Sequence, residues 1–227
     1  MDAADVARVL RALGIDGCTA SHLLAENFEK SVWRVDTTEG RFALRMLRPH
    51  DDDAADRELA ILAAARAAGV PVSALRARGT VEGRPVLLLS WTEGQTLAVE
   101  ARARPWLVYR LGFALGEQQA NLHRAVMPDP SPGAWIDRFG VADHAMRERV
   151  AALPSTPPSL LHLDFHADNV VVKGRTVTGV LDWENAIVGD RRADVARTWS
   201  LLRLRPREPQ RYERATTVFR RVLAGAW

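Results

Sequence analysis

Three oxygen-bearing side chains with the spacing of a reactive site lie in the second half of the chain: Asp164, Asn169 and Asp182. Asp164 and Asn169 are five positions apart, and Asp182 follows two short apolar runs at residues 170–172 and 177–181. Sites that transfer phosphoryl groups place a catalytic carboxylate, an amide and a second carboxylate in this order, and the last two hold magnesium. The spacing therefore predicts a phosphoryl-transfer site.

The two apolar runs must position these groups. Both are rich in β-branched residues, and the segment between them contains Gly174, which predicts a hairpin with a tight turn. We expect Asn169 and Asp182 to lie opposite each other at its open end, where opposed side chains of an antiparallel pair are roughly 5 Å apart. An amide oxygen and a carboxylate could then share Mg²⁺, and Asp164 could face the same point as a base.

The pattern His162-x-Asp164-x-x-x-x-Asn169, followed by Leu181-Asp182-Trp183-Glu184, resembles the aminoglycoside phosphotransferase and choline kinase-like family of small-molecule kinases. Further segments match in the family's order: residues 32–35 and 42–45, 57–72, 87–94, 115–123 and 189–196. The resemblance implies an α+β, bilobal protein-kinase-like fold. Its β-rich N-lobe would span residues 1–89, its hinge 90–94 and its mainly helical C-lobe 95–227.

The same resemblance implies an activity, namely transfer of the γ-phosphoryl group of ATP or GTP to a hydroxyl of an antibiotic-like or metabolite acceptor. Asp164 would be the base, and Asn169 and Asp182 would bind Mg²⁺. The nucleotide would be bound by Arg45, Glu58, Ser31 and the segment Ser90, Trp91, Thr92 and Glu93. Two further residues, His162 and Asp194, would support the catalytic loop.

Two features depart from the family pattern. Residues 27–31 contain no glycine where the family's phosphate-covering turn often has one, so the backbone has less freedom to approach a phosphate. Arg45 occupies the third-strand position usually held by lysine, and the only lysines of the chain are Lys30 and Lys173. An arginine binds phosphate as a planar fork rather than as a compact charge.

Two other readings of these residues are open. His162, Asp164, His166 and Asp168 alternate along the chain, so in a strand they would share one face and could bind zinc or a two-metal centre for hydrolysis. The glycine-free turn and Arg45 instead favour a catalytically silent nucleotide-binding scaffold. The first reading leaves Asn169 and Asp182 unexplained, and the intact Asp164, Asn169 and Asp182 argue against the second.

The composition is that of a globular enzyme, with 47% hydrophobic and 26% charged residues among 227. The net charge of +3 reflects arginines concentrated after residue 186, and no zinc-ligand set or aromatic-basic motif accompanies them, so we expect no nucleic-acid partner. A single cysteine, Cys18, and the absence of a signal peptide or of a long apolar run predict a cytoplasmic protein without a membrane segment.

Helical periodicity predicts three of the positioning elements. Val6, Val9 and Leu10 recur at helical spacing near the N-terminus, and an alanine-rich helix is expected from about residue 53 to residue 68. Pro105 suits the first turn of a third helix that reaches residue 122. Proline-rich segments at residues 128–133 and 154–158 predict loops. The oligomeric state is left open.

Overall fold

The computed structural model describes the chain except residues 1–2, 27–29, 128–143, 155 and 205–221. The predicted loop at residues 128–133 and the glycine-free turn at residues 27–29 therefore lie outside the described residues. The chain forms two compact units, Met1–Leu62 with Ser73–Thr92, and Ala63–Val72 with Glu93–Trp227. Each unit carries a different group of the residues that the sequence singles out.

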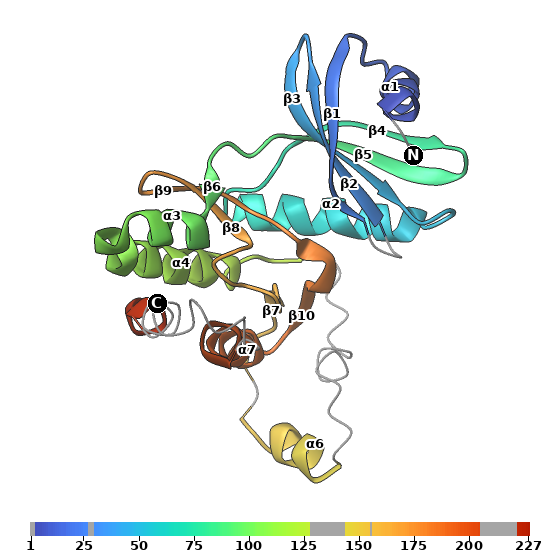
Figure 1. The fold of residues 1–227 in the computed structure, drawn as a ribbon. Helices are drawn as coiled ribbons and strands as arrows, with labels where there is room; N and C mark the ends of the chain where they lie inside the picture. The colour runs from blue at the N-terminus through green and yellow to red at the C-terminus, as the bar shows by residue number, and fades with distance from the viewer. Residues whose placement is uncertain (1–2, 27–29, 128–143, 155, 205–221) are drawn as a thin grey trace. The chain divides into compact units, whose positions relative to one another are not determined.

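The first unit is an antiparallel five-stranded sheet in the order β1-β2-β3-β5-β4 (Figure 1). Its strands are β1 (Cys18–Glu26), β2 (Lys30–Thr37), β3 (Gly40–Leu47), β4 (Leu75–Val81) and β5 (Arg84–Ser90). The strand β3 lies inside the sheet, paired with β2 on one side and β5 on the other. The pairing on both sides fixes the backbone of β3, which contains Arg45.

Helix α1 (Ala3–Ala12) covers part of this sheet, as its apolar spacing predicts. Val6, Val9 and Leu10 are at most 4% exposed and belong to one apolar cluster with sheet residues such as Val35 and Leu44. Burial of an aliphatic side chain stabilises a fold by about 1.5–3 kcal/mol. The cluster therefore anchors the sheet that carries Arg45.

Helix α2 (Asp52–Ala67) follows β3 and agrees with the helix expected from residue 53 to residue 68. Its first turn contains Asp52 and Asp53, whose charges suit the positive end of a helix dipole. Ion pairs join the helix to the sheet through Glu58 and Asp56, which contact Arg45 and Arg78.

The second unit is mainly helical. Its helices are α3 (Leu97–Ala103), the short η1 (Pro105–Leu107), α4 (Val108–Leu122), α6 (His144–Ala151), η2 (Trp183–Asn185) and α7 (Arg191–Leu204), and residues 222–226 are also helical. Pro105 begins the 3-10 turn η1 that leads into α4, rather than α4 itself. None of the described helices combines the length and the apolar character needed to cross a membrane.

Short strands complete this unit: β6 (Gln95–Thr96), β7 (Ser159–Leu161), β8 (Val170–Lys173), β9 (Thr176–Val180) and β10 (Ile187–Gly189). The predicted hairpin is β8 and β9, in which Lys173 pairs with Thr176 and Gly174 has a φ of +66°. Such a positive φ is the backbone conformation that glycine adopts at low cost. The turn residue therefore explains the hairpin.

The register at the open end differs from the expectation. Leu181 N–H donates to Asn169 O at 2.8 Å, so Asn169 lies opposite Leu181 rather than Asp182. Asp182 follows in a left-handed conformation with φ +63° and ψ +67°. The predicted pairing of Asn169 with Asp182 was therefore wrong by one residue, because the ladder ends before Asp182.

The segment after Thr92 is joined to this hairpin. Gln95 pairs with Val172, and Thr178 Oγ1 donates to Glu93 O at 2.7 Å. Gly94 lies between these contacts with a φ of +128°, and a Cβ there would overlap the carbonyl oxygen of Val172. Only glycine fits where the two backbones approach so closely.

Candidate active site

A pair of hydrogen bonds fixes Asp164 and Asn169 relative to each other. Asn169 Nδ2 donates to the backbone oxygen of Asp164 and to its carboxylate Oδ2, both at 2.9 Å. These bonds also orient the amide, because they commit its nitrogen to Asp164 and leave Oδ1 for another partner. The spacing of five residues in the sequence thus becomes a rigid contact.

His162 braces the loop that carries Asp164. Its Nε2 donates to Leu181 O at 2.9 Å, and its Nδ1 accepts from the backbone N–H of Asp164 at 3.3 Å. The ring is completely buried, and this burial lowers its pKa below the ordinary value despite the opposing effect of Asp194. His162 is therefore a neutral imidazole with both nitrogens hydrogen-bonded, which leaves neither for a metal.

Asp194 of α7 holds the same loop through its backbone. Its Oδ1 accepts from the N–H groups of His162 at 3.1 Å and Leu163 at 2.7 Å. Burial acts to raise the pKa of this carboxyl, but hydrogen bonds from His123, Gln119 and the Leu163 N–H hold it below its ordinary value. A buried, ionised acceptor of this kind makes hydrogen bonds stronger than those of neutral groups.

The loop contains an unusual backbone conformation directly before Asp164. Leu163 has a φ of +60°, and Asp182 on the far side of the hairpin has +63°. Non-glycine residues in this region cost of order 1–3 kcal/mol and occur where the surroundings enforce them, frequently at functional sites. Here Asp194 enforces the conformation of Leu163.

His166 lies against two carboxylates. Its Nε2 is 3.5 Å from Asp164 Oδ2, and its Nδ1 is 3.5 Å from Asp168 Oδ2. Burial acts to lower the pKa of His166, but hydrogen bonds to Asp164 and Asp168 outweigh it and raise the pKa to about 9. The Asp168 N–H also lies 3.2 Å from Nδ1, an approach that would need an unprotonated nitrogen. The raised pKa favours the protonated ring.

The charge on His166 affects its neighbour Asp164. The hydrogen bond from His166 lowers the pKa of Asp164 more than burial raises it, and Asn169 adds to the lowering. Asp164 is therefore a carboxylate at neutral pH. It can accept a hydrogen bond from a hydroxyl group and direct that group's oxygen.

The oxygens of Asn169 and Asp182 are of a type that suits a hard divalent cation. The Asn169 amide oxygen and the Asp182 carboxylate are of the type that Mg²⁺ prefers, and Mg²⁺ usually takes its other ligands from water and from substrate phosphates. The hydrogen bonds that hold Asn169 Nδ2 to Asp164 leave the amide oxygen as the atom of this side chain that could bind a cation. The donor set therefore fits magnesium.

The first unit contributes an ion pair. Arg45 of β3 pairs with Glu58 of α2 through Nη1 and Oε1, and their side chains are only 11% and 14% exposed. Within the described part of the chain, Arg45 Nε is buried without a hydrogen-bond partner. Ser31 of β2 is 6% exposed, so little of its hydroxyl reaches solvent.

The segment predicted to contact adenine is already partly hydrogen-bonded. Ser90 N–H donates to Ala74 O at 2.8 Å, Ser90 Oγ accepts from Ala74 N–H at 2.8 Å, and Thr92 Oγ1 lies 3.1 Å from Ser73 Oγ. Trp91 lies 5.9 Å from the Arg41 guanidinium. The Glu93 carbonyl also accepts a hydrogen bond from Thr178. The backbone groups of Trp91 and Thr92 are therefore the better candidates for hydrogen bonds to adenine.

The hydrolase reading is wrong in its structural premise. Residues 162–168 are not a strand, so the alternating His162, Asp164, His166 and Asp168 do not share one face. Across the described residues, no three His, Cys, Asp or Glu side chains are grouped to hold a metal. Both nitrogens of His162 are also hydrogen-bonded within the protein.

The sequence did not reveal several residues that hold Asp194 in place. Gln119 Nε2 donates to Asp194 Oδ2 at 2.8 Å and to Thr198 Oγ1 at 2.9 Å, and His123 Nε2 donates to the same Asp194 oxygen at 2.8 Å. Trp227 Nε1 donates to Gln119 Oε1 at 3.0 Å. One signal was present, since Gln119 follows Leu111 and Leu115 at four-residue spacing on the buried stripe of α4.

Comparison with known proteins identifies the family. The model of the phosphotransferase enzyme family matches residues 22–224, which is most of the chain. The chain belongs to this family. A relative is the homoserine kinase of Rhodopseudomonas palustris (strain BisB5), 28% identical over an alignment of 209 positions that covers 79% of this chain and 62% of that enzyme. The chain thus spans less than two thirds of that relative's length.

Solved structures agree on the fold. Aminoglycoside phosphotransferase APH(4)-Ia superimposes with a TM-score of 0.67 at 16% identity over 99% of this chain and 90% of that chain. Aminoglycoside-3'-phosphotransferase of type VIII gives 0.63 at 18% identity over 98% of each chain. The protein therefore has the α+β, bilobal protein-kinase-like fold that its sequence predicts.

Proposed function

We propose that the protein is a small-molecule kinase that transfers the γ-phosphoryl group of ATP, or of GTP, to a hydroxyl group of its acceptor. The observation that carries this proposal is the double hydrogen bond from Asn169 to Asp164, on a loop fixed by Asp194. These bonds join Asp164, which would direct the acceptor hydroxyl, to Asn169, which would hold the metal. A cytoplasmic location, where nucleoside triphosphates are abundant, belongs to the same proposal.

Asp164 acts on the acceptor hydroxyl mainly by orientation. A carboxylate whose pKa is lowered by His166 and Asn169 is a weak base, so it contributes little driving force for early removal of a proton. Phosphoryl transfer needs little such force, because its transition state is loose and its catalysis rests on positioning and charge stabilisation. Asp164 accepts the hydroxyl proton as the new oxygen–phosphorus bond forms.

Asn169 Oδ1 and the Asp182 carboxylate would hold Mg²⁺, which would neutralise charge on the phosphate oxygens. Asn169 stays in place through its bonds to Asp164, and the conformation of Asp182 is supported by the bond from His162 to the preceding carbonyl of Leu181. The same two residues that carry the metal are thereby linked to the catalytic loop.

The nucleotide is bound by residues of the first unit and the segment that follows it. Arg45, oriented by its ion pair with Glu58, binds phosphate oxygens through the exposed part of its guanidinium group. Ser31 is a weaker phosphate contact, and within the segment Ser90 to Glu93 the backbone of Trp91 and Thr92 contacts the adenine edge. These roles are supported by family membership and by the burial of the Arg45–Glu58 pair.

The acceptor is a small alcohol. The named relatives define the compounds to test first, because one is a homoserine kinase and solved neighbours were crystallised with hygromycin B, spectinomycin and streptomycin. An antibiotic-like polycation and a zwitterionic or neutral metabolite make opposite demands on the charge of the pocket. An acceptor panel must therefore contain both.

A product-mass screen tests this function. Purified protein is incubated with ATP, Mg²⁺ and a panel of L-homoserine, aminoglycosides, macrolides and sugars. We expect one class of acceptor to gain a phosphoryl group, with ADP formed in equal amount. The Asp164→Asn variant, which keeps the shape of the side chain, is the matched control and should form little product.

Two results would contradict the proposal. Failure of Mg²⁺·ATP and Mg²⁺·GTP to bind in calorimetry would remove the kinase reading altogether. Nucleotide binding without transfer to any acceptor, with no difference between wild type and Asp164→Asn in ADP release, would favour a silent nucleotide-binding scaffold.

A further inference from the structure

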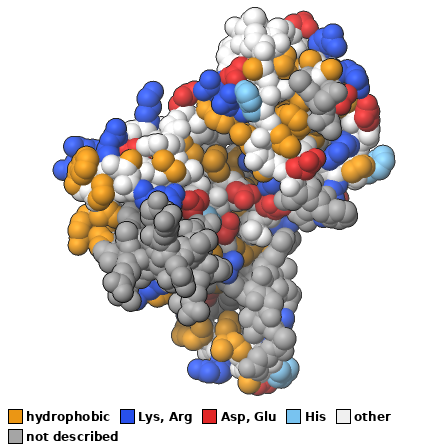
Figure 2. All heavy atoms as spheres, viewed as in Figure 1, with side chains coloured by type: hydrophobic (Ala, Val, Ile, Leu, Met, Phe, Trp, Pro, Cys, Tyr) orange, Lys and Arg blue, Asp and Glu red, His pale blue; other side chains and the backbone are white. Residues whose placement is uncertain are grey.

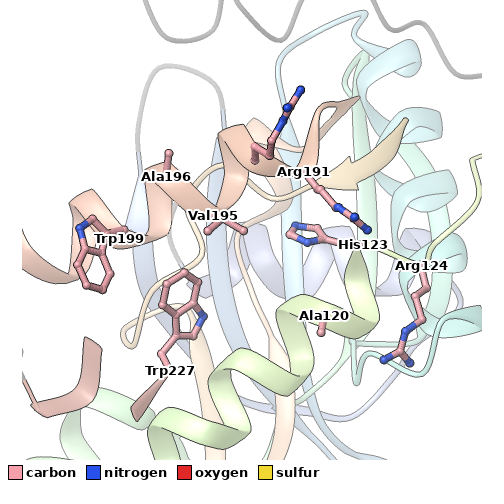
Figure 3. A pocket seen from close by; sticks show the side chains of 9 residues that line it. Ala120, His123, Arg124, Arg191, Val195, Ala196, Trp199 and Trp227 are labelled. Carbon is pink, nitrogen blue, oxygen red and sulfur yellow. The ribbon is translucent and has the colours of Figure 1, made fainter. Parts of the chain in front are cut away.

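The second unit contains a pocket apart from the residues of the proposed active site. It has a volume of about 620 Å³ and is lined by α4, α7 and the last residue of the chain (Figure 3). Its wall includes His123, Arg124, Arg191, Arg192, Trp199 and Trp227, and small apolar side chains complete it. Asp164, Asn169 and Asp182 do not line it. Its volume lies in the range of small-molecule sites, roughly 300–1,000 Å³.

Two indoles form one end of the pocket. The ring centroids of Trp199 and Trp227 are 6.4 Å apart at an interplanar angle of 38°, and Figure 3 shows the two rings beside each other. Trp199 is 40% exposed although it is large and apolar. Trp227 is held in orientation by its hydrogen bond to Gln119. The Arg203 guanidinium covers one face of Trp199, 3.9 Å from the ring centroid, so a flat apolar ligand would pack against the other face of Trp199 and against Trp227.

Among the described residues, the side chains that line this pocket include three arginines and no aspartate or glutamate. Arg192 is neutralised by Asp190, to which its Nε and Nη2 donate at 2.5–3.0 Å. Arg124 donates to the neutral amide oxygen of Asn121, so its charge is not compensated by that contact. Arg191 is exposed at the start of α7.

The nearest buried carboxylate does not change this balance. Asp194 lies beneath His123, has no exposed surface, and directs both oxygens to donors of the protein. Figure 2 shows that arginine and lysine side chains elsewhere on the visible face are interspersed with acidic ones. In the part of the chain that the structure describes, the lining of this pocket therefore combines arginines with indoles and contains no acidic side chain.

We propose that this pocket binds a small anionic molecule with a flat apolar body, such as an aromatic carboxylate. The anionic group pairs with Arg191 and Arg124, and the ring packs against Trp199 and Trp227. Guanidinium groups bind carboxylates through paired hydrogen bonds, and aromatic walls supply the apolar contact area.

The ligand contacts residues that support the catalytic loop. His123 donates to Asp194, and Trp227 donates to Gln119, which in turn donates to Asp194. Asp194 accepts from the N–H of Leu163, directly before Asp164. A molecule bound between these side chains therefore acts on the same hydrogen-bonded set that holds the loop, whatever reaction the loop carries out.

A matched pair of probes tests the site. 2-Naphthoate and 2-naphthylmethylammonium have the same ring and opposite charges, and their binding is measured by calorimetry and by NMR of the tryptophan indole N–H groups. We expect 2-naphthoate to bind at one site per chain and to shift the Trp227 indole signal. The cation should bind at least tenfold more weakly.

Two variants locate the binding. Trp199→Ala and Arg191→Glu should each weaken 2-naphthoate binding at least tenfold. Trp106→Ala and Arg175→Glu are the matched controls, because Trp106 is 76% exposed in η1 and Arg175 lies in the β8–β9 turn, both outside the lining. The urea midpoint of each variant confirms that it is folded.

The proposal fails if 2-naphthoate does not bind at millimolar concentration. It also fails if the cation binds as tightly, or if the control variants lower affinity as much as Trp199→Ala and Arg191→Glu do. None of these measurements uses nucleotide or acceptor, so they are independent of the kinase assay.

Discussion

Asp194 accepts a hydrogen bond from the backbone N–H of Leu163 at 2.7 Å, although the two residues are 31 positions apart. Leu163 has a φ of +60° and directly precedes Asp164. The buried carboxylate therefore stabilises a backbone conformation that a leucine adopts only at a cost. Through this contact α7 helps to position Asp164, the residue that follows Leu163.

Asp164→Asn should separate binding from transfer. The amide keeps the size of the side chain and an oxygen for Asn169, but loses the charge that directs a hydroxyl. We expect transfer to fall by roughly 10²-fold or more, the scale for loss of a positioned base. Affinity for Mg²⁺·ATP should stay within about twofold. Single-turnover kinetics and calorimetry measure the two quantities, and equal transfer rates would exclude Asp164 as the base.

Asp182→Ala should weaken metal-dependent nucleotide binding. Changes even to residues that support metal ligands lower metal affinity about 10–100-fold, so loss of a ligating carboxylate should cost at least about tenfold. Calorimetry of ATP with Mg²⁺ and with EDTA gives the magnesium-dependent part. Glu184→Gln, two residues further along, is the control. An unchanged magnesium dependence in Asp182→Ala would show that Asp182 is not a ligand.

Arg45→Ala should raise the KM for ATP. Hydrogen bonds to charged groups contribute about 1.5–3 kcal/mol, which corresponds to roughly 10–100-fold in affinity. Arg45→Lys should recover part of this, because it restores the charge but not the planar fork. Arg78→Ala is the matched control, since Arg78 makes an exposed ion pair with Asp56 of the same helix. If both alanine variants had the same KM, Arg45 would have no role in nucleotide binding.

Asp194→Asn should destabilise the protein. The amide would place its own donor against those of His123, Gln119 and the loop backbone, and each buried donor left without a partner costs about 1–3 kcal/mol. We expect the free energy of unfolding to fall by about 2 kcal/mol or more. Urea denaturation measures it, and Glu117→Gln on the exposed side of α4 should cost less than about 0.5 kcal/mol. Equal effects would place Asp194 outside the supporting network.

The contribution of Asp194 should also depend on pH. Its pKa in the folded protein is held below the ordinary value of 3.8, so the carboxylate adds stability above that value and loses it as the pH falls through the folded-state pKa. The stability difference between wild type and Asp194→Asn should be constant above about pH 5 and should shrink in acid. A difference that grew in acid would contradict the depressed pKa.

His166 should be protonated at neutral pH. Its pKa is raised to about 9 by Asp164 and Asp168 against the effect of burial, so its contribution to stability is present below the ordinary 6.5 and is lost as the pH rises toward 9. An NMR titration of the imidazole nitrogens measures this pKa directly, and Asp168→Asn should lower it. If the wild-type ring titrated below pH 7, His166 would be neutral at pH 7, and its unprotonated Nδ1 would accept the hydrogen bond from the Asp168 N–H.

Local features made much of the fold predictable. The β-branched runs around Gly174 indicated the β8–β9 hairpin, and helical spacing indicated α1 and α2 within one residue of their observed positions where bounds were predicted. The register of Asn169 was misjudged by one residue because the pairing ends at Leu181, where Asp182 enters a left-handed conformation. Residue type alone does not fix that change.

The supporting network could not be read from the sequence. Gln119 and Asp194 are 75 positions apart, and Trp227 and Gln119 are 108 apart, so only the folded chain joins them. Local periodicity contains no information on such contacts. The charge states of His166 and Asp164 likewise depend on distances and burial, whereas the identities of Asp164, Asn169 and Asp182 follow from a short motif.

Gly94 imposes an evolutionary constraint. Its backbone lies so close to Val172 that any side chain would overlap the Val172 carbonyl oxygen, and its φ of +128° disfavours every other residue. Val172 belongs to the hairpin that follows Asn169 and precedes Asp182. Orthologues should therefore retain glycine at this position even where the surrounding residues diverge. A lineage that replaced it would need a compensating change in the path of β8.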